Sequence, residues 1–190
     1  MRRYLISFLF VLAVIAGSAA LFFPSYWTHR YDDLIARQAR VYRLDEKLVW
    51  SLIYEETYFR AWKIGAAQEV GLMQVTPVVA RDWAHETGLK DYERQTAENV
   101  EQFLIDPERN LQAGCWYLQK LREEYRGRPA ETAMTLAAYN AGPSRVEDWT
   151  RDIDQTSMTE DEFISRIGIP STRAYVTSIL ARYRKSQGPQ

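Results

Sequence analysis

Apolar residues follow one another at helical spacing along almost the whole chain beyond Trp27. Intervals of three and four residues dominate, and no segment shows the sustained alternation of a half-buried strand. The pattern predicts an all-α domain without internal repeats. The predicted helices cover residues 31–42, 45–58, 76–88, 106–127, 130–140 and 143–149, and a last helix follows Pro170.

Residues that begin and end helices support these bounds. Asp45 is a suitable N-cap, and the pairs Thr76-Pro77 and Asp106-Pro107 place a proline at the first helical position. Gly142-Pro143 can stop the helix that precedes it. Residues 150–161 are polar and acidic, so we expect an exposed excursion there.

The N-terminal segment differs from the rest, because residues 4–23 carry no charge and follow Arg2-Arg3. A helix of about twenty residues spans about 30 Å, the thickness of the hydrocarbon layer of a membrane. A cleaved signal peptide usually has a shorter apolar core, although Ala16-Gly17-Ser18 could serve as a cleavage site. We favour an uncleaved transmembrane anchor over residues 1–27, with residues 28–190 across the membrane from the two arginines.

Composition narrows the function classes. The formal net charge of −1 gives no basis for broad nucleic-acid binding. Cys115 is the only cysteine, which excludes an internal disulfide and a thiolate metal cluster, and its apolar neighbours at helical spacing favour a buried, inert thiol. His29 and His85 have no metal-ligand partner at helical spacing. The sequence therefore implies no metal and no cofactor.

Two adjacent carboxylates, Glu55 and Glu56, lie near the end of the helix predicted over residues 45–58. At about 100° per residue, with Val49 at zero, the apolar stripe of this helix is centred near about 320°. Glu56 falls at about 340°, inside the stripe, and Glu55 at about 240°, on its edge. Glu56 is thus predicted to point inward, and the two carboxylates do not form a pair that shares one proton.

An inward Glu56 has two interpretations. An ionised carboxylate among Leu and Ile side chains is costly. Desolvation favours the neutral acid, and a neutral acid near pH 7 can protonate a leaving oxygen. Alternatively, the helix frays before Glu56, or the carboxylate simply meets an arginine. This stretch alone leaves both interpretations open.

Five blocks of the chain, in order, resemble the motifs of the lytic transglycosylases of the soluble-transglycosylase (SLT, family 1) type. The resemblance extends over roughly residues 31–183 and implies a lysozyme-like fold for the helical domain. The blocks are ETYF at 56–59, GLMQVTP at 71–77, DPERNLQAG at 106–114, LAAYNAGP at 136–143 and IPSTRAYV at 169–176.

The resemblance implies that the substrate is peptidoglycan. Glu56 would give a proton to the glycosidic oxygen between N-acetylmuramic acid (MurNAc) and N-acetylglucosamine (GlcNAc). It would then take a proton from the C6 hydroxyl of the MurNAc, which closes on its own C1 to give a 1,6-anhydro end without adding water. One carboxylate suffices because the substrate supplies the nucleophile, whereas most glycosidases use two.

The resemblance also implies which residues bind the substrate. Gly71 would leave room for a sugar against the backbone, Gln74 would bond an N-acetyl group, and the Tyr175 hydroxyl could orient the catalytic acid. Without their blocks, Tyr139 and Tyr175 would be interpreted as core residues. The implied substrate-binding residues are Thr57, Gly71, Met73, Gln74, Tyr139, Asn140 and Tyr175.

The chain also departs from the family pattern. Glu55 stands where the family usually has glutamine, and Gln68 stands where a glycine is usual. Thr57 replaces the usual serine and keeps its hydroxyl. Glu69 has two interpretations: a second acid in the groove, or a solvated loop residue.

The sequence thus predicts a peptidoglycan lytic transglycosylase held in the bacterial inner membrane by a single-pass helix. Its catalytic domain would lie in the periplasm or on the cell-wall side, with peptidoglycan glycan strands and the membrane as partners and no nucleic acid. Two alternatives stay open. One is a muramidase that hydrolyses the same bond with water, and the other is a non-catalytic peptidoglycan-binding module.

Overall fold

The computed structural model describes residues 4, 11, 17–18 and 22–188. The chain forms two compact units, Met1–Asp33 and Leu34–Gln190. Most of the predicted anchor over residues 1–27 lies outside the described residues. Among the helices that are described, none is long and apolar enough to cross a membrane.

The described part of the chain contains helices and no strand, in agreement with the predicted all-α class. Two isolated bridges, Ile64 with Val70 and Val70 with Val75, shape the loop between α3 and α4. The helices are α2 (Asp32–Val41), α3 (Glu46–Thr57), α4 (Pro77–Thr87), α5 (Lys90–Ile105), α6 (Pro107–Glu124), α7 (Glu131–Ala141), α8 (Pro143–Thr150), α9 (Glu160–Arg166) and α10 (Pro170–Gln187).

The predicted capping residues are confirmed. The Asp45 side chain accepts a hydrogen bond from the backbone N–H of Lys47 at 2.8 Å, which satisfies a free donor at the start of α3. Thr76 and Asp106 cap α4 and α6 in the same way, each directly before a proline. These side chains fix the ends of the helices on either side of the loop over residues 58–76.

Two helices differ from the prediction. No helix was predicted over α5, because its first half is almost entirely polar. In the structure, Asn99 interrupts this helix with a non-helical φ of −153°. The exposed excursion predicted over residues 150–161 is largely confirmed, because most of its residues are exposed. Thr150 and Met158 are buried, however, and α9, which was not predicted, begins at Glu160. A capping box between Thr159 and Glu162 nucleates α9, a short helix with too few apolar positions to produce a periodic pattern.

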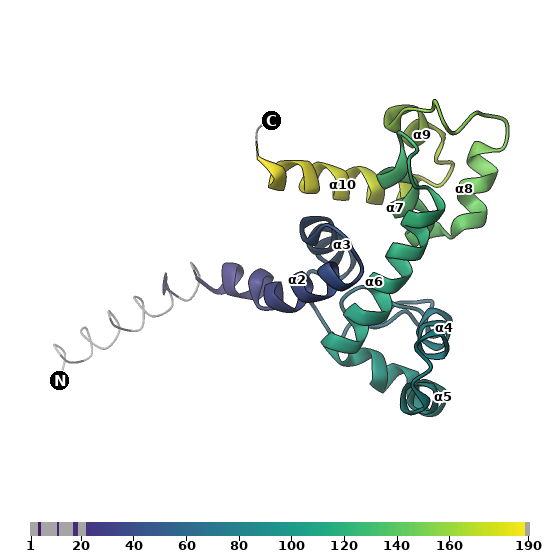
Figure 1. Cartoon of the computed structure of the whole chain (residues 1–190). Coiled ribbons are helices and arrows are strands. Elements are labelled where there is room, and N and C mark those ends of the chain that lie inside the picture. The colour runs from purple at the N-terminus through teal and green to yellow at the C-terminus, as the bar shows by residue number, and fades with distance from the viewer. Residues whose placement is uncertain (1–3, 5–10, 12–16, 19–21, 189–190) are drawn as a thin grey trace. The chain divides into compact units, whose positions relative to one another are not determined.

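Within the unit Leu34–Gln190, α6 lies between two groups of helices (Figure 1). Helices α4 and α5 pack on each other and on α6 at one end, while α7, α8 and α9 pack together at the other. Helix α10 lies against α3, α7 and α9. Residues of α6 such as Leu111, Cys115 and Leu118 are fully buried, so this helix runs through the core.

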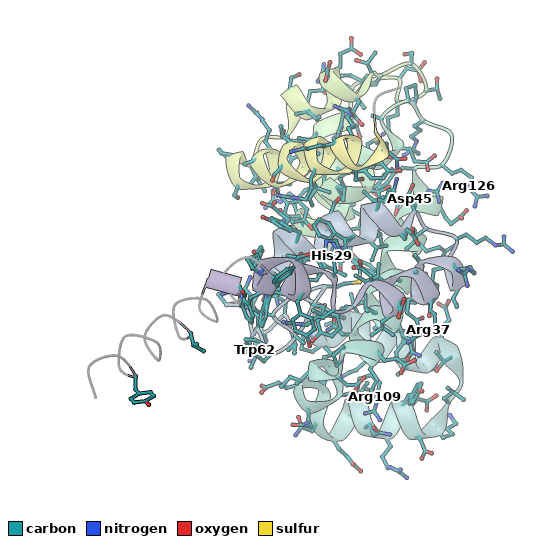
Figure 2. All side chains as sticks on the ribbon, turned by 90° about the vertical axis from the view of Figure 1, so that its left-hand side faces the viewer. His29, Arg37, Asp45, Trp62, Arg109 and Arg126 are labelled. Carbon is teal, nitrogen blue, oxygen red and sulfur yellow. The ribbon has the colours of Figure 1, made fainter. Side chains whose placement is uncertain are left out.

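Helix α10 is tied to the start of α3 by side-chain hydrogen bonds. Asp45, which Figure 2 labels, accepts hydrogen bonds from the Tyr183 hydroxyl at 2.8 Å and from the Gln187 amide at 3.1 Å. At the other end of the unit, Arg109 of α6 donates to Gln95 of α5 at 2.7 Å. These hydrogen bonds hold α10 against the start of α3, and α6 against α5.

Candidate active site

Glu56 lies in the last turn of α3, and its carboxylate accepts a hydrogen bond from the Tyr175 hydroxyl of α10 at 2.6 Å. Burial raises the pKa of Glu56 to about 7, against the hydrogen bond from Tyr175 and the charge of Lys63, which both lower it. The inward orientation predicted from the helical angle agrees with this burial. A carboxyl group with a pKa near neutrality can give and take a proton at pH 7.

Glu55 is held in an ion pair and does not share the environment of Glu56. Its carboxylate accepts a hydrogen bond from the Ser178 hydroxyl at 2.6 Å and lies 3.1 Å from the Arg182 guanidinium. The same guanidinium stacks over the Tyr54 ring, 4.0 Å from its centroid. The charge that stands in place of the family's usual glutamine therefore joins α3 to α10.

One face of α10 holds both neighbouring carboxylates. Tyr175, Ser178 and Arg182 are spaced by three and four residues, so they lie on the same side of the helix. Tyr175 contacts Glu56, while the other two contact Glu55. The ion pair at Glu55 thus fixes the part of α10 from which the Tyr175 hydroxyl reaches the buried acid.

The loop over residues 63–75 is held by Asn110 of α6. The buried Asn110 side chain accepts a hydrogen bond from the Met73 backbone N–H at 2.8 Å and donates to the carbonyl oxygens of Val70 at 2.7 Å and Leu104 at 3.0 Å. All the partners are backbone atoms. One buried amide therefore sets the path of the loop that carries the GLMQ block.

Gly71 lies against this same side chain. It has φ +79°, and a Cβ added to it would stand 2.2 Å from Asn110 Nδ2 and 2.6 Å from the Leu104 carbonyl oxygen. Only glycine fits that conformation and that space. The Asn110 side chain and the Leu104 carbonyl group fill the space that a side chain at residue 71 would need. Gly71 is therefore required for the conformation of the loop.

Thr57, at the end of α3, binds the backbone of the loop through its side chain. Its hydroxyl is buried and donates to the Leu72 carbonyl oxygen at 3.0 Å and to the Ile53 carbonyl oxygen at 3.3 Å. Thr57 stands where the family usually has serine, and its hydroxyl is already hydrogen-bonded to the backbone of the loop. The geometry thus gives Thr57 a role in holding the loop against α3.

Met73 and Gln74 both face the interior. Met73 is fully buried, with its sulfur 3.9 Å from that of Cys115. Gln74 has φ +49°, and its side-chain amide donates to the carbonyl oxygens of Lys63 at 3.1 Å and Gly71 at 3.0 Å. The Gln74 amide was predicted to bond an N-acetyl group, but its nitrogen donates to two backbone carbonyl groups of its own loop.

Tyr139 and Asn140 reach the site from α7. The Tyr139 hydroxyl donates to the Met73 carbonyl oxygen at 2.7 Å, and burial raises the pKa of this tyrosine well above its usual value. Its ring lies beside that of Tyr117, at 5.6 Å between centroids. Asn140 is exposed and accepts a hydrogen bond from the Thr172 hydroxyl at 2.7 Å.

A groove of about 780 Å³ extends alongside α4 and α6 and includes Tyr117, the ring neighbour of Tyr139. Its walls combine aromatic rings with charged side chains, a lining that suits sugars with flat apolar faces and polar edges. Residues on these walls include Val79, His85, Glu86, Trp116, Tyr117, Lys120 and Pro143.

Two other kinds of chemistry receive no support from the described residues. No group of three His, Cys, Asp or Glu side chains there is arranged to hold a metal ion. Cys115 is buried, and burial raises the pKa of its thiol, which keeps it protonated and unreactive. The thiol predicted to be buried and inert is confirmed as buried.

Comparison with known proteins decides the family. The model described as "Transglycosylase SLT domain" matches residues 33–161. The chain belongs to the SLT domain family. The match includes the glutamate of α3, the GLMQ loop, the Asp106-Pro107 block and the AYNAGP block, which are the parts that the structure brings together.

Two curated relatives of this SLT domain are similar over much of its length. A "Membrane-bound lytic murein transglycosylase C" from Actinobacillus succinogenes is 32% identical over 123 residues, which is 62% of this chain and 32% of the relative. A "Soluble lytic murein transglycosylase" from Salmonella typhimurium is 29% identical over 178 residues, which is 90% of this chain and 25% of the relative. The chain thus spans a quarter to a third of these proteins.

A solved structure confirms the predicted lysozyme-like SLT fold. An inactive glutamate-to-glutamine mutant of the lytic transglycosylase Slt from Pseudomonas aeruginosa matches with a TM-score of 0.72 at 25% identity. The match covers 86% of this chain and 25% of that one.

Three residues that support the site were not singled out from the sequence. Asn110 lies in the Asp106-Pro107 block, and its position in that block was the available signal. Lys63 donates from its ammonium to the Glu56 carbonyl oxygen, and Arg182 pairs with Glu55. Neither lysine nor arginine lies in a motif, so no sequence pattern pointed to them.

Proposed function

We propose that this SLT domain is a lytic transglycosylase that cleaves the β-1,4 bond between MurNAc and GlcNAc in peptidoglycan and leaves 1,6-anhydroMurNAc ends. Glu56 is its single acid and base. The proposal rests on one observation: a half-buried carboxyl group with a pKa of about 7 accepts a hydrogen bond from a tyrosine hydroxyl in a domain of this family. That group is half protonated near neutral pH, as a residue with both roles requires.

The reaction needs one carboxyl group in two protonation states. Protonated Glu56 gives its proton to the glycosidic oxygen, and the bond from that oxygen to C1 of the MurNAc breaks. The C6 hydroxyl of the same MurNAc then bonds to C1, and its proton passes to the Glu56 carboxylate. Tyr175 donates a hydrogen bond to Glu56 Oε1 and so stabilises the charged form that the first step leaves.

The substrate-binding residues divide into two groups in this proposal. The sugar would meet Tyr139, Asn140 and Tyr175 directly. Tyr117, the ring neighbour of Tyr139, lines the groove. The other group acts through the loop, whose backbone it holds in one conformation; it comprises Thr57, Gly71, Met73 and Gln74. Both groups serve a glycan strand that lies along the groove beside α4 and α6.

The relatives support the activity and the substrate. Their names describe transglycosylases that act on murein, and the Pseudomonas aeruginosa protein is inactive when a glutamate is changed to glutamine. A catalytic glutamate that cannot be replaced by its neutral isostere fits the role proposed for Glu56.

The N-terminal segment, residues 1–27, is the proposed single-pass anchor in the bacterial inner membrane, and residues 28–190 are the catalytic domain on the periplasmic or wall side. The uncharged run over residues 4–23 after Arg2-Arg3 supports it. So does the printed name of a membrane-bound relative. N-terminal sequencing of the mature protein from membrane fractions tests it, since a start after residue 18 would contradict an uncleaved anchor.

Product analysis tests the activity. Purified peptidoglycan is digested with the protein, and mass spectrometry identifies the new glycan ends. Anhydro-MurNAc ends support the proposal, whereas reducing MurNAc ends would assign a muramidase. If no soluble product forms at any protein concentration tested, the domain is a non-catalytic binding module.

A further inference from the structure

Glu69 carries a buried carboxylate oxygen with no partner. Its Oε2 is one of the few buried side-chain oxygens in the described residues without a hydrogen bond. A buried acceptor that has lost water and gained no donor is unfavourable, and a charged one especially so. Such an atom in a native structure needs a reason.

The hairpin that carries Glu69 is built to receive its side chain. A Cβ added at Gly65 would stand 2.3 Å from Glu69 Cδ and 2.5 Å from its Oε1, so the carboxylate occupies the place of a side chain at residue 65. The Gly65 N–H donates to the Glu69 carbonyl oxygen at 2.7 Å, and Gln68 takes φ +65° in the turn between them. The carboxylate is therefore held in one place by the fold of the loop.

This carboxylate lies close enough to Glu56 to act on it. Its negative charge raises the pKa of Glu56, as the more weakly acting charge of Glu55 does. The other titratable groups that act on the pKa of Glu56 are Tyr175 and Lys63, which both lower it. Glu55 is neutralised by Arg182, whereas Oε2 of Glu69 has no donor.

We infer that Glu69 is a substrate-binding carboxylate, which accepts a hydrogen bond from a hydroxyl or amide N–H of the sugar bound beside Glu56. The inference rests on the proposed function, because it takes the occupant to be a glycan of MurNAc and GlcNAc. Sugar hydroxyls and acetamido N–H groups are donors, and a donor at Oε2 gives the buried oxygen a hydrogen-bond partner. Gly65 has no side chain and so leaves the space that the Glu69 carboxylate occupies.

The test measures binding without turnover, in the background of E56Q. Peptide-free glycan strands are titrated into E56Q, E56Q/E69A, E56Q/E69Q and E56Q/G65A by calorimetry. We expect E69A to weaken binding by about tenfold and E69Q by less, because glutamine keeps an acceptor but loses the charge. G65A displaces the carboxylate with its Cβ and should weaken binding as well.

A double-mutant cycle and a matched control separate this role from others. If Gly65 acts only by housing Glu69, G65A has no further effect once E69A is present. E56Q/E101Q carries the same change of charge at an exposed glutamate of α5 and should bind as E56Q does. Because Oε2 has no donor to lose, the Tm of E69A should equal or exceed that of its parent.

Binding by E56Q/E69A within twofold of E56Q would overturn the inference, and so would a loss of binding that comes with a Tm several degrees lower. The proposed function fails separately, if the wild-type protein produces no anhydro ends. If the wild-type protein produces anhydro ends but E69A does not weaken glycan binding, the proposed activity is supported and only the role of Glu69 in binding is wrong.

Discussion

The two sides of Glu56 are built differently. On the side of α10, side chains contact side chains: Tyr175 donates to Glu56, and Arg182 pairs with Glu55. On the side of the loop over residues 63–75, side chains contact backbone atoms, as Asn110 and Thr57 do. The first side tunes the charge of the acid, and the second fixes the main chain beside it. Substitutions should therefore alter pH dependence on one side and stability on the other.

Replacement of the acid itself should have the largest effect. We expect E56Q to lower the rate of peptidoglycan cleavage by about 10²- to 10⁴-fold, because a neutral amide can neither give nor take the proton. The rate of release of soluble fragments measures it. Cleavage within a few-fold of wild type would remove Glu56 from the mechanism.

The same variant should change how stability depends on pH. The pKa of Glu56 lies at about 7 in the folded protein and near 4.5 in an unfolded chain, so the folded state binds more protons between these pH values. The wild-type protein then loses up to about 3 kcal/mol of unfolding free energy as pH rises through this window. E56Q lacks this loss, and urea unfolding at pH 4.5 and 8 measures the difference.

On the loop side, N110A should cost stability most. It removes the three hydrogen bonds that hold the loop and leaves buried backbone groups unpaired, for an expected loss of about 2–4 kcal/mol. Thermal unfolding measures it. N99A makes the same change at an exposed asparagine that accepts one bond from Gln102, and should cost about 1 kcal/mol or less. Equal losses in the two variants would contradict the central role of Asn110.

On the α10 side, Y175F should move the pH profile. The Tyr175 hydrogen bond lowers the pKa of Glu56, so its loss raises that pKa further and shifts the profile of cleavage to higher pH. A shift of about half a unit to one unit is expected for one hydrogen bond to a charged group. Y183F removes a hydroxyl from the same helix that contacts Asp45 instead, and its profile should match wild type.

The smallest effect is expected at Thr57. T57V removes the donor to the Leu72 carbonyl oxygen at nearly constant volume and should cost about 1–2 kcal/mol, while T57S keeps the bond and should cost less. Chemical unfolding of the two variants compares them. If T57V instead impaired cleavage at full stability, Thr57 would belong with the residues that touch the sugar.

Much of the fold could be predicted from local sequence signals. Asp45 was identified as a cap, and Thr76-Pro77 and Asp106-Pro107 as helix starts, because these signals depend on a few adjacent residues. Glu56 was identified as inward because one helical period decides it. The polar first half of α5 offered no such period, so that helix was missed.

The roles of the motif residues depended on distant partners. Gly71 is constrained by Asn110, and Thr57 by Leu72, through contacts that only the folded chain makes. Glu55 pairs with Arg182 across 127 residues of sequence. A motif shows which residues belong together, but not whether each faces the groove or the core.

The pKa of Glu56 tests the central claim most directly. Carbon-13 labelling of the glutamate side chains and a titration by NMR would follow each carboxyl group, and the resonance missing from E56Q identifies Glu56. The account predicts a midpoint of about 7, well above those of the exposed glutamates. A midpoint near 4.5 would contradict it, because the acid would then be ionised at the pH where it must donate its proton.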